Sequence, residues 1–311
     1  MRIFHSSFFN REMVVRLVGL VSLVTVAHAQ TLYVSVNGSG TIQQVSSGGV
    51  VSSFASGLAA PKGLAFGPNG SLFVAQDVSG TNTSLISQVS VPGGVVSNFT
   101  TGIQYPIGVA FNTGGDLFIA SHSSPVGVLQ VASGSNTATT FSTGLNDPFG
   151  VAVDSSGTLF VANRTNGTIS KVNMSDGTFT QFASGLSQPN DLTFSSTGDL
   201  FVSNFTAGTV SRITPGGVVS TFVSGLSSPV GLAFNPITGA LFVAQQGTDT
   251  IAEVALAGGS FTTFASVSGG PQYLAFSPSA IPEPSTYAFV AGLIAFGVVV
   301  WRRRRALVAG S

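Results

Sequence analysis

One stretch of the sequence decides the fold: Ser56-Gly57-Leu58-Ala59-Ala60-Pro61-Lys62-Gly63-Leu64-Ala65-Phe66, followed by Asn69-Gly70-Ser71-Leu72-Phe73-Val74-Ala75. Versions of it recur along the middle of the chain, and each carries a marker proline. These prolines are Pro61, Pro106, Pro148, Pro189, Pro229 and Pro271. They are 45, 42, 41, 40 and 42 residues apart. A repeat of about 40–50 residues is typical of propellers and of other arrays of supersecondary units.

Each repeat contains four short strand patterns. In the second repeat these are Gly63–Phe66, Leu72–Ala75, Leu85–Val89 and Val95–Phe99. The first two are separated by the turn signal Gly67-Pro68-Asn69-Gly70, so they pair as antiparallel neighbours. The second pattern is a continuous apolar run in every repeat, which is typical of a strand buried on both faces. The sequence therefore predicts four-stranded antiparallel blades that stack face to face.

The two ends of the repeat region complement each other. Leu32–Ser35, Thr41–Val45 and Val50–Phe54 match the second, third and fourth strands of a repeat, and Gln272–Phe276 matches a first strand. Five internal blades and one blade shared by the two ends make six, and this sharing closes the ring and removes open sheet edges. We therefore expect an all-β, six-bladed β-propeller at residues 30–280.

The N-terminal segment has the three parts of a secretory signal peptide. Arg2, Arg11 and Arg16 precede an apolar run at Leu17–Ala27, and Ala27-His28-Ala29 is a small-x-small cleavage signal. A first transmembrane helix is the alternative, but the apolar run is shorter than the roughly 20 residues that span a bilayer. The sequence predicts a signal peptide at residues 1–29 and export of the protein.

The C-terminal segment, residues 281–311, contains a second apolar run. Tyr287–Trp301 carries no charge and is followed by Arg302, Arg303, Arg304 and Arg305. We expect a C-terminal transmembrane helix here, with the arginines in the cytoplasm and the propeller outside.

The combination of Pro282, Glu283 and Pro284 with an apolar helix and a terminal arginine cluster resembles a PEP-CTERM sorting signal. Such tails occur in Gram-negative bacteria that make exopolysaccharide. The resemblance implies a processing partner, an exosortase of the inner membrane, that cuts near the Pro-Glu-Pro motif. It also implies that the helix anchors the protein in the membrane before processing, and that the protein is then at the cell surface or extracellular. A plain single-pass anchor remains the alternative.

The repeat region resembles the six-bladed propellers of the NHL-repeat and gluconolactonase-like groups. The resemblance covers about 250 residues and rests on a generic repeat, so it implies a fold more than a function.

Charge is scarce in the repeat region. It holds four basic and nine acidic residues, a net charge near −5, and the whole chain is 7% charged and lacks cysteine. A mildly acidic body without a basic patch argues against nucleic acid as a partner. The absence of cysteine excludes disulfides and thiol chemistry.

Function is expected on one face of the ring. In a propeller, the loops after each second strand and after each fourth strand emerge on the same face, and loops on a rigid scaffold carry function. The candidate ligand residues in these loops are Lys62, Asp77, His122, Asn163, Arg164, Asn190, Asp191, Asn204, Gln245, Asp249 and Gln272.

Three features of these loops raise the question of catalysis or metal binding. His122 is the one histidine of the repeat region, and it is either a general base, a metal ligand or a solvated loop residue. Asp77 and Asp249 are either ligands of Ca²⁺ or solvated carboxylates. Asn190-Asp191 resembles the Pro-Asn-Asp phrase of gluconolactonase-like metalloenzymes, which implies Asn190 as a metal ligand. The equivalent loops carry Ile107, Phe149 and Val230, which departs from that family's pattern.

Two functions follow as hypotheses. The first is an exported binding or interaction module without a cofactor, whose partner is exopolysaccharide or another envelope protein. The alternative is a lactonase or related hydrolase that depends on Ca²⁺ or another divalent cation.

Overall fold

The computed structural model describes residues 30–78, 84–122, 127–255 and 259–278. Residues 30–278 form one compact unit that contains the strands β1 to β24. Each sheet has four strands. The predicted signal peptide at residues 1–29, the predicted transmembrane helix and the predicted sorting motif fall outside the described residues. Among the residues that are described, no helix is long and apolar enough to cross a membrane.

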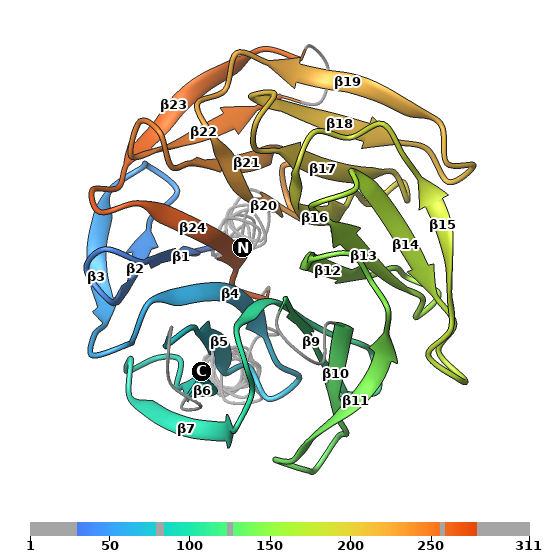
Figure 1. Ribbon diagram of the computed structural model, residues 1–311. Helices are drawn as coiled ribbons and strands as arrows, with labels where there is room; N and C mark the ends of the chain where they lie inside the picture. Colours follow the sequence, from blue (N-terminus) through green and yellow to red (C-terminus); the bar gives the residue numbers. More distant parts are fainter. Residues whose placement is uncertain (1–29, 79–83, 123–126, 256–258, 279–311) are drawn as a thin grey trace, which may run out of the picture. The chain divides into compact units, whose positions relative to one another are not determined.

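Six sheets surround a central axis, and we call them blades 1 to 6 (Figure 1). Blade 1 contains β24 (Pro271–Phe276), β1 (Leu32–Val36), β2 (Thr41–Val45) and β3 (Val51–Ala55). Blade 2 contains β4 (Pro61–Phe66), β5 (Leu72–Gln76), β6 (Leu85–Val89) and β7 (Val96–Thr101). Blade 3 contains β8 (Pro106–Phe111), β9 (Leu117–Ser121), β10 (Gly127–Val131) and β11 (Ala138–Thr143).

Blade 4 contains β12 (Pro148–Val153), β13 (Leu159–Asn163), β14 (Thr168–Val172) and β15 (Phe179–Ala183). Blade 5 contains β16 (Pro189–Phe194), β17 (Leu200–Asn204), β18 (Thr209–Ile213) and β19 (Val219–Ser224). Blade 6 contains β20 (Pro229–Phe234), β21 (Leu241–Gln245), β22 (Thr250–Val254) and β23 (Phe261–Ser266). Each blade is an antiparallel meander from an inner to an outer strand, and the inner strands of neighbouring blades contact one another around the axis.

The prediction that the two ends share blade 1 is confirmed. β24 pairs antiparallel with β1, with Leu32 opposite Phe276 and Val34 opposite Leu274. The pairing continues past the strands, because the Ser277 N–H donates to the Thr31 carbonyl at 2.9 Å. The ring is thus closed by backbone hydrogen bonds between the two ends of the unit.

An aromatic ring in each second strand holds neighbouring blades together. Phe201 of β17 is 2% exposed and packs edge to face on Phe222 of β19, with ring centroids 4.8 Å apart. It also meets Phe234 of β20, in the next blade, at 4.9 Å. Comparable triads centre on Tyr33, Phe73, Phe160 and Phe242. The repeated Leu-Phe-Val run therefore supplies the core between the blades.

Each inner strand begins with a marker proline whose preceding residue has a positive φ. That residue is Ala60, Tyr105, Asp147, Gln188, Ser228 or Gly270. A left-handed backbone is unfavourable for residues other than glycine and persists only where the surroundings enforce it. Here the enforcing contacts are backbone hydrogen bonds to the loop after the second strand, as from Arg164 N–H to the Asp147 carbonyl at 3.0 Å.

The third residue of the inner strand sits against the next blade. It is glycine in four blades, and a Cβ on Gly150 would lie only 2.7 Å from the Asn190 carbonyl oxygen and from the Asp191 Cα. Asp191 in blade 5 and Tyr273 in blade 1 replace this glycine. The two exceptions to the repeat therefore lie where backbones approach most closely.

Candidate functional site

The predicted candidates come from the two predicted sets of loops. Lys62, Asn190 and Gln272 are the second residues of β4, β16 and β24, whereas Asp77, His122 and Arg164 lie just beyond the ends of β5, β9 and β13. Hydrogen bonds join the loops before the inner strands to those after the second strands, so both sets share one face. We call this the site face.

The amides at the ends of the second strands connect the loops of their own blade. The Oδ1 atom of Asn163 accepts from the Asn146 N–H at 3.3 Å, and its Nδ2 donates to the hydroxyls of Thr168 and Ser170 at 3.1 and 2.9 Å. Asn204 and Gln245 make the equivalent bonds. These amides are buried, and both the oxygen and the nitrogen of each one form hydrogen bonds within the propeller. We therefore assign Asn163, Asn204 and Gln245 to the scaffold of the loops.

Two further candidates also bind the backbone of their own loops. The Asp249 carboxylate accepts from the Gly270 N–H at 2.9 Å and holds the loop before β24. The Gln272 side chain is buried and its Nε2 donates to the Gly270 carbonyl at 3.4 Å. Neither side chain contributes to the cluster around the axis described below.

The buried polar groups nearest the axis are Asn190, Asp191 and Tyr273. The Tyr273 hydroxyl donates to Asn190 Oδ1 at 3.4 Å, so a side chain of blade 1 reaches one of blade 5. Asp191 Oδ2 accepts from the Leu232 N–H of blade 6 at 2.8 Å. Burial raises the pKa of Asp191 from 3.8 to about 7, although bonds from the N–H groups of Leu232 and Leu192 oppose this shift.

A serine accompanies each replacement of the repeat glycine. The Ser203 hydroxyl accepts from the Asp191 N–H at 3.0 Å and donates to the Val230 carbonyl of the next blade at 2.6 Å. Ser35 makes the same two bonds, to the Tyr273 N–H at 3.0 Å and to the Lys62 carbonyl at 2.6 Å. The other four blades have alanine at this position, Ala75, Ala120, Ala162 and Ala244. The serine therefore bridges two inner strands where no glycine allows close packing.

Aromatic rings hold Arg164 on the site face. Its guanidinium carbon lies 4.4 Å from the ring centroid of Phe149 and 5.4 Å from that of Phe205. These are cation–π distances. The Nε atom of Arg164 is buried and has no hydrogen-bond partner within the described part of the chain. Arg164 is thus fixed by apolar contacts and keeps unsatisfied donor capacity.

His122 and Lys62 lie on the two preceding blades. The His122 Nδ1 atom is 3.6 Å from Asp147 Oδ1, and its ring packs edge to face on Tyr105 at 5.0 Å. Burial is the main reason that the pKa of Lys62 is lowered; Asp77 raises it and Arg164 lowers it further. We call Lys62, His122, Phe149, Arg164, Asn190 and Tyr273 the axial site.

The site face also carries the residues that the alternative hypothesis makes metal ligands. Among residues 30–78, 84–122, 127–255 and 259–278, no three His, Asp or Glu side chains come together to hold a metal ion. The oxygen of Asn190, which the gluconolactonase resemblance makes a metal ligand, accepts the Tyr273 hydroxyl instead. The described imidazole and carboxylate groups therefore form no cluster of three for the Ca²⁺ or other divalent cation of the alternative hypothesis.

Tyr105, Phe149, Phe205 and Tyr273 were not among the predicted site residues. Tyr273 carries a usable signal, because it interrupts the Pro-x-Gly pattern of the inner strands. Asp191 interrupts the same pattern. The contribution of Phe205 depends on how the loop after β17 folds over Arg164, and the sequence contains no sign of it.

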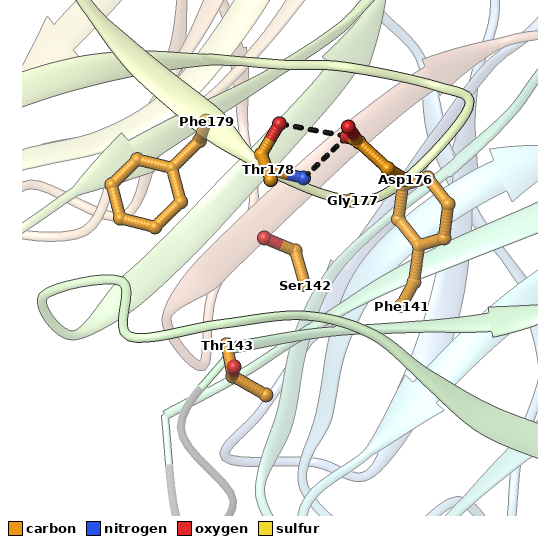
Figure 2. A pocket seen from close by; sticks show the side chains of 7 residues that line it. All are labelled: Phe141, Ser142, Thr143, Asp176, Gly177, Thr178 and Phe179. Carbon is orange, nitrogen blue, oxygen red and sulfur yellow. Dashed lines mark hydrogen bonds between the residues drawn. The ribbon is translucent and has the colours of Figure 1, made fainter.

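Two clefts lie between neighbouring blades. One has a volume of about 380 Å³ and lies between β11 and the turn before β15 (Figure 2). Figure 2 shows the Ser142 hydroxyl pointing into this cleft, where the Thr178 N–H and hydroxyl also bind the Asp176 carboxylate at 2.9 and 2.7 Å. The Ser142 oxygen is buried and unpartnered among the described residues.

The second cleft, of about 550 Å³, lies between blades 2 and 3. In the other five blades the turn between the last two strands has a glycine of positive φ that approaches the preceding blade's outer phenylalanine, as Gly177 approaches Phe141. In blade 3 Asn136 occupies this position and lines the cleft. An asparagine side chain prevents the close approach, which leaves this groove wider.

Comparisons with solved structures show the same fold at low identity. A structure of a nidogen/laminin complex has a TM-score of 0.71 at 18% identity and covers 80% of this chain and 99% of that one. A streptogramin B lyase has a TM-score of 0.61 at 14% identity, and the match covers 79% of this chain and 86% of that one. Virginiamycin B lyase from Staphylococcus aureus has a TM-score of 0.59 at 14% identity, and the match covers 77% of this chain and 82% of that one.

A comparison with curated proteins gives no match. A comparison with family models matches residues 13–254 to the virginiamycin B lyase family, which is well over half of the chain. Because that match spans most of the propeller, from the first blade into the last, the chain belongs to the virginiamycin B lyase family.

Proposed function

We propose that this protein is an exported binding module that recognises its ligand with the axial site. The observation that supports this best is the position of Arg164, whose guanidinium lies over two aromatic rings while its Nε has no partner in the described residues. Aromatic surface beside polar groups with free hydrogen-bonding capacity is the usual composition of a ligand site.

The ligand that we propose is exopolysaccharide at the cell surface. The composition supports this: the surface has few charges and many hydroxyl and amide groups. The test is co-sedimentation of the purified full-length protein with exopolysaccharide isolated from its host. We expect binding that Phe149→Ala weakens and Phe179→Ala, an exposed ring on the outer strand β15, leaves unchanged. Equal binding by both variants would place recognition elsewhere on the propeller.

The route to the surface is part of the same proposal. We propose export by the signal peptide at residues 1–29, transient anchoring by the C-terminal helix, and cleavage by an exosortase near Glu283. The three-part sequence of the tail supports this. Mass spectrometry of the native protein tests it. Peptides from Tyr287 onward in the extracellular fraction would leave the tail as an anchor only.

A lyase is the second candidate, and one specific observation favours it besides the family. His122 lies 3.6 Å from the Asp147 carboxylate, an arrangement that orients an imidazole for proton transfer. A comparison structure is described as a catalytically inactive histidine variant of virginiamycin B lyase with quinupristin. Incubation with virginiamycin B, followed by mass spectrometry of the product, tests the candidate. Turnover that His122→Ala abolishes and Phe179→Ala retains would replace the binding proposal.

A further inference from the structure

Two cations of the axial site, Lys62 and Arg164, lie near each other, and the charge of Asp77 partly offsets that of Lys62. Lys62 and Arg164 lie close enough for the charge of Arg164 to lower the pKa of Lys62. The described residues contain two ion pairs, His122–Asp147 and Arg212–Asp199, and neither includes Lys62 or Arg164. Holding two like charges near each other and partly out of water is unfavourable unless an anion accompanies them.

The neighbouring carboxylates do not fill this role. Asp77 is near enough to raise the pKa of Lys62, but forms no ion pair with it, and its Oδ1 is buried without a hydrogen-bond partner among the described residues. Asp147 binds the Thr165 hydroxyl at 3.1 Å and approaches His122. Asp191 is bound to backbone N–H groups of blades 5 and 6. Among the described residues, the Arg164 guanidinium therefore has no carboxylate within ion-pair distance.

The surroundings of Arg164 favour an organic anion over a free inorganic one. Phe149 lies against one side of the guanidinium and is itself half-buried, so apolar ring surface adjoins the charge. Asn190 and Tyr273 are buried and bond to each other, and the charge of Arg164 reaches the Tyr273 hydroxyl. A planar guanidinium binds a carboxylate through two parallel hydrogen bonds, and an ammonium adds a point charge.

We propose that the axial site binds the carboxylate of an acidic sugar, a uronic acid unit of a polysaccharide, with Arg164 on the carboxylate, Lys62 as a second cation and Phe149 holding the guanidinium in place. This inference rests on the proposed binding function and specifies its ligand. The positive charges of Lys62 and Arg164 favour acidic over neutral saccharides, although the propeller as a whole is acidic.

Calorimetric titration of the purified full-length protein with an oligogalacturonate, and with a neutral galactan oligomer of the same length, tests the inference. We expect binding of the acidic oligomer only, weakening with added salt. Arg164→Gln and Lys62→Gln should each weaken it at least tenfold, and Arg164→Lys by less, because charge remains but the planar fork is lost. Lys171→Gln, which removes an exposed cation of blade 4 on β14, should leave the affinity unchanged.

The outcomes separate this inference from the proposed function. Equal affinity for the neutral oligomer, or unchanged affinity in folded Arg164→Gln and Arg164→Lys variants, overturns the acidic-sugar inference and leaves a binding module. No binding of the acidic oligomer by a protein that melts cooperatively also overturns the inference. Co-sedimentation with host exopolysaccharide then decides the proposed function separately.

Discussion

Replacing Asp191 by asparagine should remove a large dependence of stability on pH. Asp191 is 7% exposed, and burial raises its pKa from 3.8 to about 7. Below pH 3.8 the carboxyl group is protonated in both the folded and the unfolded chain, so it contributes no pH dependence. Between these two values the unfolded chain loses the proton and the folded chain keeps it. The free energy of unfolding therefore falls as pH rises, and levels off above about pH 7.

The size of the effect follows from the shift. About three pKa units correspond to roughly 4 kcal/mol over the whole window, and about 2–3 kcal/mol of this falls between pH 5 and pH 8. The side chain of asparagine does not titrate in this range, and it keeps one oxygen that can accept from the Leu232 N–H. We expect the free energy of unfolding of Asp191→Asn to change less between pH 5 and pH 8 than that of the parent, by about this amount.

Urea unfolding of the two proteins at pH 5, 6, 7 and 8 measures the difference. Asp176→Asn is the control, because Asp176 is exposed and hydrogen bonds to Thr178 lower its pKa. It titrates below the range tested, so the control should follow the parent. Parallel curves for the parent and Asp191→Asn would show that Asp191 is ionised in the folded protein, and the argument from burial would be wrong.

Three other predictions concern the scaffold. Deleting residues 272–276 removes most of β24 and should cause aggregation or loss of cooperative unfolding; a soluble variant with an unchanged melting midpoint would contradict ring closure. Gly150→Ala should lower the free energy of unfolding by about 1–3 kcal/mol, because the added methyl group meets the backbone of β16. Gly216→Ala, in an exposed turn with open space, is its control and should cost little. Ala60→Gly should raise the unfolding free energy by about 1 kcal/mol by relieving a φ of 42°; chemical denaturation tests it, and an unchanged midpoint would show that no strain is stored there.

The fold could be predicted because its signals are local and repeated. The marker prolines start all six inner strands, and the second, apolar pattern of each repeat became a fully buried strand. The split blade also followed from sequence, since the two partial repeats have complementary strands. Strand ends were less exact: β7, predicted at Val95–Phe99, is Val96–Thr101.

The site could be predicted only to the level of a face. Which loops meet is a property of the topology, so the sequence could predict that the loops carrying Lys62, Arg164 and Asn190 share one face. The direction of a side chain does not follow from the topology, because the pairing register shifts near the start of each inner strand. In blade 5 the shift lies between Pro189 and Leu192. A period-two pattern therefore fails there. For the same reason the sequence did not show that Tyr273 reaches Asn190.

The joint made by β24 and β1 also determines where the two ends of the propeller lie. Every inner strand starts at the site face and ends at the opposite one, so Phe276, Ser277 and Gln30 lie together on the side away from Arg164. Any covalent attachment through either end therefore starts on that far side. A support joined to the propeller at Gln30 or Pro278 would adjoin the side opposite Arg164, and the site face would point away from it.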